Sequence, residues 1–140
     1  MEPNLGRVLV VDDEPDVRQA VRRLLERTGH QVYPAANGRE ALEMLRSLTW
    51  CELIVLDLMM PVLDGYETLE RLREGGFERI PVILLTAKFS PLEIARGHDA
   101  GANLFVRKPF KPIALLNAVS YLLCETAQEK SGSNARATTE

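Results

Sequence analysis

The sequence predicts a doubly wound α/β domain, with a five-stranded parallel sheet and five helices. Five short apolar runs alternate with five segments whose apolar residues recur at helical spacing. The runs are continuously apolar, as in parallel strands buried beneath helices on both faces. Pro34 interrupts the second run, and a proline favours an edge strand. With right-handed crossovers, the predicted spatial order of the strands is 2-1-3-4-5.

The elements can be placed in order. The first strand, residues 8–11, leads into three acids, and Pro15 suits the first turn of a helix that Gly29 ends. The second strand covers residues 31–36. The next three helices are each predicted to begin at a capping residue with a glutamate three positions later: Asn37 with Glu40, Asp64 with Glu67, and Ser90 with Glu93.

The remaining elements repeat the same alternation. Further strands are predicted at residues 53–56, 82–85 and 104–106. Gly75 and Gly76 end the third helix, Gly101 ends a fourth helix over about residues 91–100, and Pro112 opens the fifth. We expect the domain to span residues 7–126, between an N-terminal extension (1–6) and a polar, disordered tail or linker (127–140).

Composition narrows the functional classes. A chain of 140 residues can form one domain with its own core. Its net charge of −3 argues against a nucleic-acid-binding face, which would be basic. Cys51 and Cys124 have no metal-site spacing, so we interpret them as free thiols. Without a signal-like N-terminus or an apolar run near the ~20 residues of a membrane span, the sequence predicts a cytoplasmic protein without membrane contact.

Polar side chains gather at successive strand ends. Asp12 and Asp13 follow the first strand, and Asp57 follows the third. The carboxyl ends of parallel strands meet at one edge of the sheet, so these carboxylates should lie together. Clustered negative charges cost energy unless a cation lies among them, and oxygen ligands suit Mg²⁺. Thr86 and Lys108 come to the same edge from the fourth and fifth strands.

This set of groups suits a phosphoryl group, whose transfer depends on positioning and charge neutralisation. Asp57 is the candidate nucleophile, because aspartyl phosphates are an established covalent intermediate. Lys108 would pair with the modified carboxylate as a point charge, and Thr86 would donate a hydrogen bond to a phosphoryl oxygen. Each residue alone has an ordinary structural explanation, such as a helix cap. Their occurrence together, in strand order, indicates the functional site.

With these residues the sequence resembles the receiver domain of two-component response regulators, which has a flavodoxin-like fold. The likeness extends from about Arg7 to Leu123. It rests on five motifs: Val10–Pro15, Leu56–Pro61 with Asp64–Gly65, Leu85–Ala87, Ala100–Ala102 and Lys108–Phe110. It implies a phosphorylation-dependent signalling switch rather than an enzyme. The phosphoryl donor would be the phosphohistidine of a histidine kinase or of a histidine phosphotransfer protein.

The resemblance also implies roles for individual residues. Asp57 would accept the phosphoryl group in the presence of Mg²⁺, with Mn²⁺ as a possible substitute. The metal contacts would be Asp12, Asp13, Asp57 and the backbone carbonyl of Met59, with Asp13 binding directly and Asp12 through water. Met59 carries no side-chain acid or amide to position an attacking water, so we expect a long-lived phosphoaspartate.

Switching is the second implication of the resemblance. Phosphorylation would draw Thr86 inward, Phe105 would follow, and the surface of the fourth helix, fifth strand and fifth helix would change for a downstream partner. Ala87 is small and would leave the phosphoryl group accessible. A cis peptide bond is expected at Lys108–Pro109.

One departure from the family pattern concerns dimerisation. Many relatives dimerise through charged pairs on this face, but the corresponding positions here are Asn103, Leu104 and Asn117. We therefore expect a monomer or a weak dimer. An exposed Leu104 would suggest an apolar partner contact, with local packing as the alternative.

Three other interpretations compete with a switching receiver. A cofactor binder on the same sheet would not place three acids, residues 12–14, where it must hold an anionic phosphate. A phosphoaspartate hydrolase would carry a second acid two residues after its nucleophile, where this chain has Met59. A receiver that no longer switches would not need the complete set of site residues. The sequence leaves open whether the chain is a stand-alone receiver or part of a longer protein.

Overall fold

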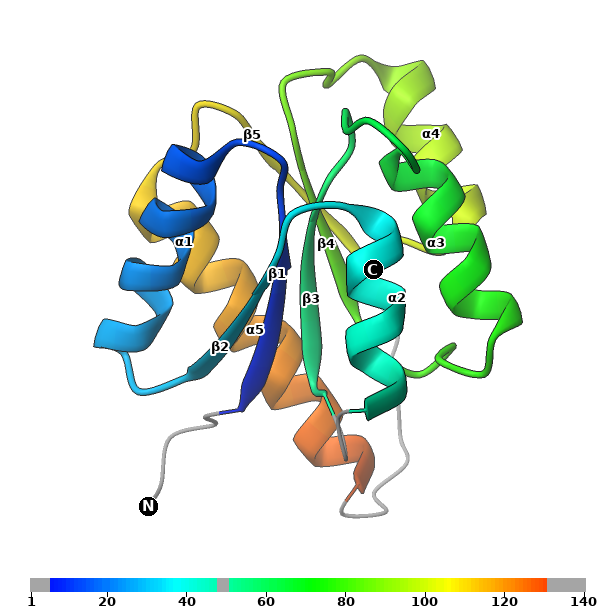
Figure 1. Ribbon diagram of the computed structural model, residues 1–140. Coiled ribbons are helices and arrows are strands. Elements are labelled where there is room, and N and C mark those ends of the chain that lie inside the picture. The colour runs from blue at the N-terminus through cyan, green and yellow to red at the C-terminus, as the bar shows by residue number, and fades with distance from the viewer. Residues whose placement is uncertain (1–5, 48–50, 131–140) are drawn as a thin grey trace.

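The computed structural model describes residues 6–47 and 51–130, with side chains up to residue 125. Five parallel strands form one sheet in the order β2-β1-β3-β4-β5, which confirms the predicted fold class and topology (Figure 1). The strands are β1 (Arg7–Val11), β2 (Gln31–Ala35), β3 (Leu53–Asp57), β4 (Val82–Thr86) and β5 (Leu104–Arg107). Pro34 lies in the edge strand β2, opposite Val10 of β1.

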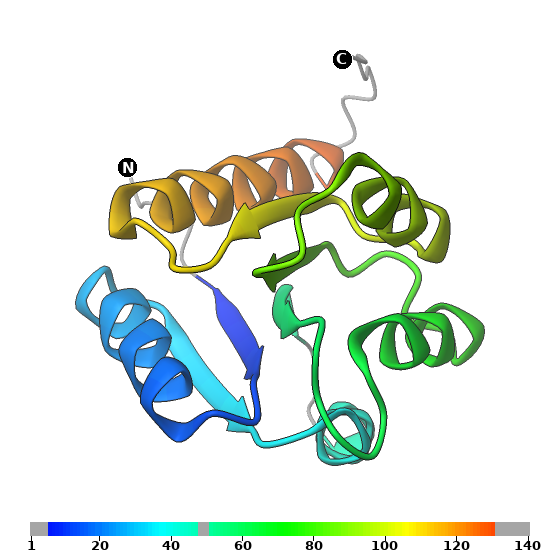
Figure 2. The ribbon, with the colours of Figure 1, turned by 90° about the horizontal axis from the view of Figure 1, so that it is seen from above.

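Helices cover both faces of the sheet. They are α1 (Pro15–Arg27), α2 (Gly38–Ser47), α3 (Gly65–Glu74), α4 (Pro91–Ala100) and α5 (Pro112–Lys130). Figure 2 shows α1 and α5 on one face, and α2, α3 and α4 on the other. Each layer buries its own apolar cluster against the sheet. Both faces of β3 and β4 are thereby sealed, which accounts for their continuously apolar sequences.

One of the three predicted capping boxes forms in full: the Asp64–Glu67 pair makes both bonds. At α2, Asn37 Oδ1 accepts the Glu40 amide proton at 2.9 Å, but the Glu40 carboxylate accepts the Ala36 amide proton. The third is only half formed. Ser90 caps α4, but the Glu93 carboxylate accepts a hydrogen bond from the Tyr66 hydroxyl of α3 instead of returning to the Ser90 amide.

The C-terminal helix is longer than the sequence suggested. α5 reaches Lys130, which lies beyond the predicted end of the domain at residue 126. Residues 1–5 of the expected extension and 131–140 of the expected tail lie outside the described part of the chain. Among residues 6–47 and 51–130, no helix combines the length and apolar character needed to cross a bilayer.

Candidate functional site

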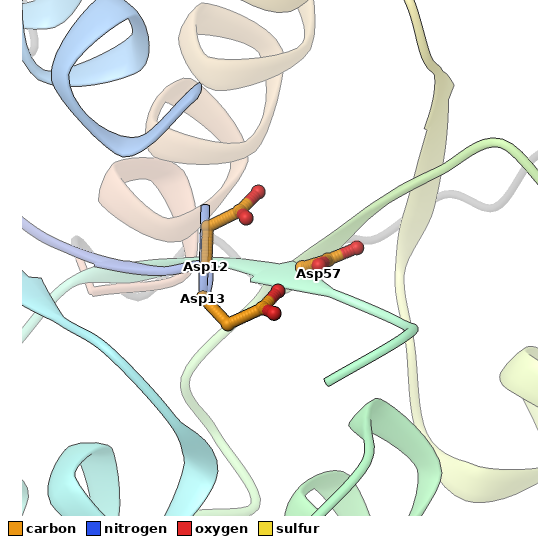
Figure 3. A group of neighbouring side chains, drawn as sticks. All are labelled: Asp12, Asp13 and Asp57. Carbon is orange, nitrogen blue, oxygen red and sulfur yellow. The ribbon is translucent and has the colours of Figure 1, made fainter. Parts of the chain in front are cut away.

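Three carboxylates meet at the carboxyl edge of the sheet. Asp12 and Asp13 follow β1, and Asp57 is the last residue of β3. Figure 3 shows their side chains extending to the same side of the strand ends. One oxygen from each carboxylate lies within 4.8 Å of the others. Asp12 and Asp57 are buried, and Asp13 is half-buried. The structure thus brings together the acids that the strand order predicted.

Asp12 is fixed from several directions. Its Oδ1 accepts a hydrogen bond from the Glu14 amide at 2.9 Å, and its main-chain carbonyl accepts one from Arg18 Nη1 at 2.7 Å. Its Oδ2 is buried and lies 3.1 Å from Lys108 Nζ. That contact is an ion pair by distance, but Oδ2 has no hydrogen-bond partner of suitable geometry in the described part of the chain. An oxygen of this kind is available to a metal ion.

Lys108 supplies the positive charge of the site. Its Nζ lies 3.1 Å from Asp12 Oδ2, 3.3 Å from Asp57 Oδ1 and 3.6 Å from Glu14 Oε1. Burial lowers the pKa of Lys108, but the attraction of Asp12 and Asp57 outweighs burial and holds the pKa above its usual value. Lys108 is therefore a permanent cation here. The Lys108–Pro109 peptide bond is cis, as the resemblance implied.

Asp57 lies in an unfavourable environment for its own charge. Burial and the neighbouring Asp12 raise the pKa of Asp57 from 3.8 to about 6, against the opposing attraction of Lys108. Its Oδ1 accepts a long hydrogen bond, 3.4 Å, from the Met59 amide. A single ammonium thus does not compensate two buried carboxylates fully, and an additional cation would relieve the repulsion.

The donor set fits a divalent metal ion. All three carboxylates are oxygen ligands, which hard cations prefer. One of them, Asp12, presents a buried oxygen without a hydrogen bond. These observations support the predicted acidic metal site at Asp12, Asp13 and Asp57.

The other predicted residues surround this pocket. Thr86 is fully buried at the end of β4, and its carbonyl accepts the Lys108 amide proton at 2.8 Å. The Thr86 hydroxyl accepts a hydrogen bond from the Lys88 amide at 2.8 Å. Ala87 is exposed. The Met59 side chain, on the loop that follows β3, is also exposed. Phe105, on β5, is partly buried and packs on the α4 side of the sheet.

Sequence reasoning missed two contacts of the pocket. Glu14 was placed in the acidic motif, but its approach to Lys108 depends on a turn that no local pattern reveals. Arg18, on the first turn of α1, donates a hydrogen bond to the Asp12 carbonyl. Its position six residues after Asp12, at the start of the helix, could have predicted this contact.

Leu104 also differs from the simplest expectation. Its side chain is partly buried and packs against the cluster beneath α1 and α5, so local packing explains it better than an exposed apolar contact. Asn103 is likewise engaged within the chain, because its Oδ1 accepts the Val82 amide proton at 2.9 Å.

The doubly wound sheet with an acidic pocket and a lysine at its carboxyl edge defines a phosphoacceptor class of domain. The family model for the response regulator receiver domain matches residues 8–120. The chain therefore belongs to the response regulator receiver domain family, and it is a phosphorylation-dependent signalling module rather than an enzyme acting on an external substrate.

Individual relatives agree with this assignment. The chain is 41% identical over 133 residues to the response regulator MprA of Mycolicibacterium vanbaalenii, covering 95% of this chain and 57% of the relative. It is 44% identical to MprA of Mycobacterium ulcerans over 88% of this chain and 52% of the relative. The chain thus spans a little over half the length of these relatives.

Solved structures show the same fold. The receiver domain of the Francisella response regulator 1452 superposes with a TM-score of 0.81 at 33% identity, over 86% of this chain and 98% of that one. Chemotaxis protein CheY4 of Vibrio cholerae gives a TM-score of 0.79 at 34% identity, over 84% and 98% of the two chains.

Proposed function

We propose that Asp57 accepts a phosphoryl group from the phosphohistidine of a histidine kinase or a histidine phosphotransfer protein. The observation that supports this most strongly is the position of the Asp57 carboxylate, which is buried with Asp12 and Asp13 and lies 3.3 Å from Lys108. A carboxylate at the end of a central strand can be reached from the strand-end edge, where Ala87 and Met59 are exposed.

In the transfer, a carboxylate oxygen of Asp57 forms a bond to phosphorus. The bond between phosphorus and the donor's imidazole nitrogen breaks, and its electron pair returns to the imidazole. Asp57 must be ionised to act as nucleophile, and Lys108 favours that form. After transfer, Lys108 would pair with the additional negative charge, and Thr86 would donate its hydroxyl proton to a phosphoryl oxygen.

We propose Mg²⁺ as the resident cation, with Mn²⁺ as a substitute. Asp12, Asp13, Asp57 and the Met59 carbonyl would hold it. When bound, the ion would supply the positive charge that stabilises the phosphoryl oxygens during transfer. The oxygen-only donor set and the partly uncompensated charge of Asp57 support this choice.

Switching follows from a change in the fourth and fifth strands. The Thr86 hydroxyl is engaged with the Lys88 amide in this structure. Turning it toward a phosphorylated Asp57 would release that bond and move the segment that leads into α4. We propose that Phe105 follows, so that the surface formed by α4, β5 and α5 changes for a downstream partner. Phosphorylation shifts this equilibrium by its different affinity for the two states.

The setting of the domain is also a proposal. Residues 7–126 would form the receiver, and the exchange would take place in the cytoplasm. With Asn103 and Leu104 engaged internally, we propose a monomer or a weak dimer that binds neither nucleic acid nor membrane directly.

Phosphorylation by a small donor tests the proposal. Incubation with acetyl phosphate and Mg²⁺ should add one hydroxylamine-labile phosphoryl group, measured by intact mass. Asp57→Asn should abolish it, while the matched change Asp64→Asn, at the half-buried N-cap of α3, should leave the yield unchanged. Equal labelling of the Asp57→Asn variant would reject Asp57 as acceptor.

A further inference from the structure

Gly97 occupies an unusual position in α4. It lies in the interior of the helix, where glycine is disfavoured because it loses the most conformational freedom on folding. It is also the buried residue of that helix, on the side that faces the sheet. A buried glycine inside a helix therefore calls for a specific reason.

The reason is the Phe105 ring. A Cβ atom at Gly97 would lie 2.5 Å from Phe105 Cζ, 2.8 Å from Cε2 and 2.9 Å from Leu84 Cδ1. All three distances are far below ordinary carbon–carbon contact. The aromatic ring therefore rests directly on the backbone of α4, in space that any other residue would fill.

Other aromatic side chains flank the Phe105 ring. Phe89, on the segment that joins β4 to α4, packs edge-on with its centroid 6.4 Å from that of Phe105. His98 packs against the ring at 4.9 Å, and its Nδ1 lies 3.0 Å from the Ala102 carbonyl. Phe105 thus contacts α4, the β4–α4 segment and Leu84 of β4. These are the elements expected to respond when Thr86 moves.

We propose that Gly97 is a positioning residue of the switch: its missing side chain gives Phe105 its place against α4, and this contact couples the ring to the helix. The inference rests on the proposed function, which assigns Phe105 to the switch. It adds that α4 and Phe105 change position together, because the ring lies on the helix backbone with no side chain between them.

Gly97→Ala tests the proposal. The added methyl group should displace Phe105, seen as a changed ¹³C-phenylalanine NMR signal that is assigned by its loss in Phe105→Leu. Because the proposed switch moves Phe105 and α4 together, losing their contact should weaken the binding of beryllofluoride, a phosphoryl mimic. The expected loss of affinity is about 5- to 150-fold, the usual range of allosteric coupling. Bound beryllofluoride is measured by ¹⁹F NMR. The Mg²⁺ affinity should stay unchanged, since Gly97 lies outside the acidic pocket.

Two further variants separate this role from general stability. Leucine lacks the Cζ and Cε2 atoms that would clash, which leaves Leu84 Cδ1 as the remaining close atom. Gly97→Ala should therefore lower the melting temperature in wild type, and lower it less in a Phe105→Leu background, where helix propensity favours alanine and only the Leu84 contact opposes it. Ala95→Gly, at an exposed position of the same helix, should lower the melting temperature without changing the beryllofluoride affinity.

The outcomes are distinguishable. A Gly97→Ala protein with an unmoved Phe105 signal and wild-type beryllofluoride affinity would overturn the inference. If the single variant does not fold, a folded double variant with Phe105→Leu supports the contact. An unfolded double variant would assign the strain to Leu84 Cδ1 and reject the role of Phe105. Failure of the wild type to bind beryllofluoride would overturn the proposed function instead. The displacement of Phe105 needs no phosphoryl mimic, so the NMR signal would still show whether Gly97 and Phe105 are in contact.

Discussion

The ammonium of Lys108 lies 3.3 Å from Oδ1 of Asp57, which ties the end of β5 to the end of β3 across the intervening strand β4. The same ammonium lies 3.1 Å from Asp12, so one cation serves two buried carboxylates. The Lys108 ammonium therefore has two opposing effects. It favours the ionised nucleophile, and it competes with any metal ion for the same oxygens.

Replacing Lys108 should separate its effect on the phosphoryl group from its competition with the metal ion. In Lys108→Met the competing charge is lost, so Mg²⁺ should bind as tightly as in wild type or more tightly, by calorimetry. Beryllofluoride should bind about tenfold or more weakly, because the anion loses a charge-assisted partner. The matched control is Lys111→Met, at an exposed lysine three residues later, which should change neither affinity. Weaker Mg²⁺ binding with unchanged beryllofluoride affinity would contradict this account of Lys108.

The charge of Asp57 should destabilise the metal-free protein. Its pKa is raised from 3.8 to about 6, so the folded state favours the protonated form and loses stability as the pH rises through about 6. In chelator, Asp57→Asn should therefore raise the free energy of unfolding by about 1–3 kcal/mol at pH 7.5. The gain should vanish near pH 4. Urea titrations at both pH values measure it, and a gain that is the same at both would show that charge is not its cause.

Much of this site was predictable from the sequence. Asp12, Asp13 and Asp57 each follow an apolar run, and parallel strands bring their carboxyl ends to one edge. Pro34 likewise identified the edge strand and with it the strand order. What could not be predicted depends on contacts between elements. Three contacts arise only once the helices have packed. They are the hydrogen bond between Tyr66 and Glu93, the hydrogen bond from Arg18 to the Asp12 carbonyl, and the packing of Phe105 against Gly97.

The lifetime of the phosphoryl group should depend on Met59. Its exposed thioether beside the pocket offers no group to orient an attacking water. We expect the wild type to keep its phosphoryl group for minutes or longer without a phosphatase. Met59→Asn or Met59→Glu should shorten the half-life by about tenfold or more, because an amide or acid can position water. Met59→Leu serves as the control, and decay within a few seconds in the wild type would contradict the prediction.

Dimerisation should stay weak even in the activated state. Asn103 is bonded to the Val82 amide, Leu104 packs inward, and Asn117 is uncharged. Size-exclusion chromatography with light scattering should therefore show a monomer, or a weak dimer that dilution dissociates, with and without beryllofluoride. A stable beryllofluoride-dependent dimer that is abolished by Leu104→Ala would show an apolar interface instead.

The central claim is that the phosphoryl group is carried by Asp57 itself. Borohydride reduces an aspartyl phosphate to homoserine, so reduction after acetyl phosphate treatment marks the acceptor permanently. Peptide mapping by mass spectrometry should find homoserine at position 57 in a Mg²⁺-dependent yield, with Asp12 and Asp13 unmodified. Homoserine at position 12 or 13, or an equal yield at position 57 in chelator, would contradict the account.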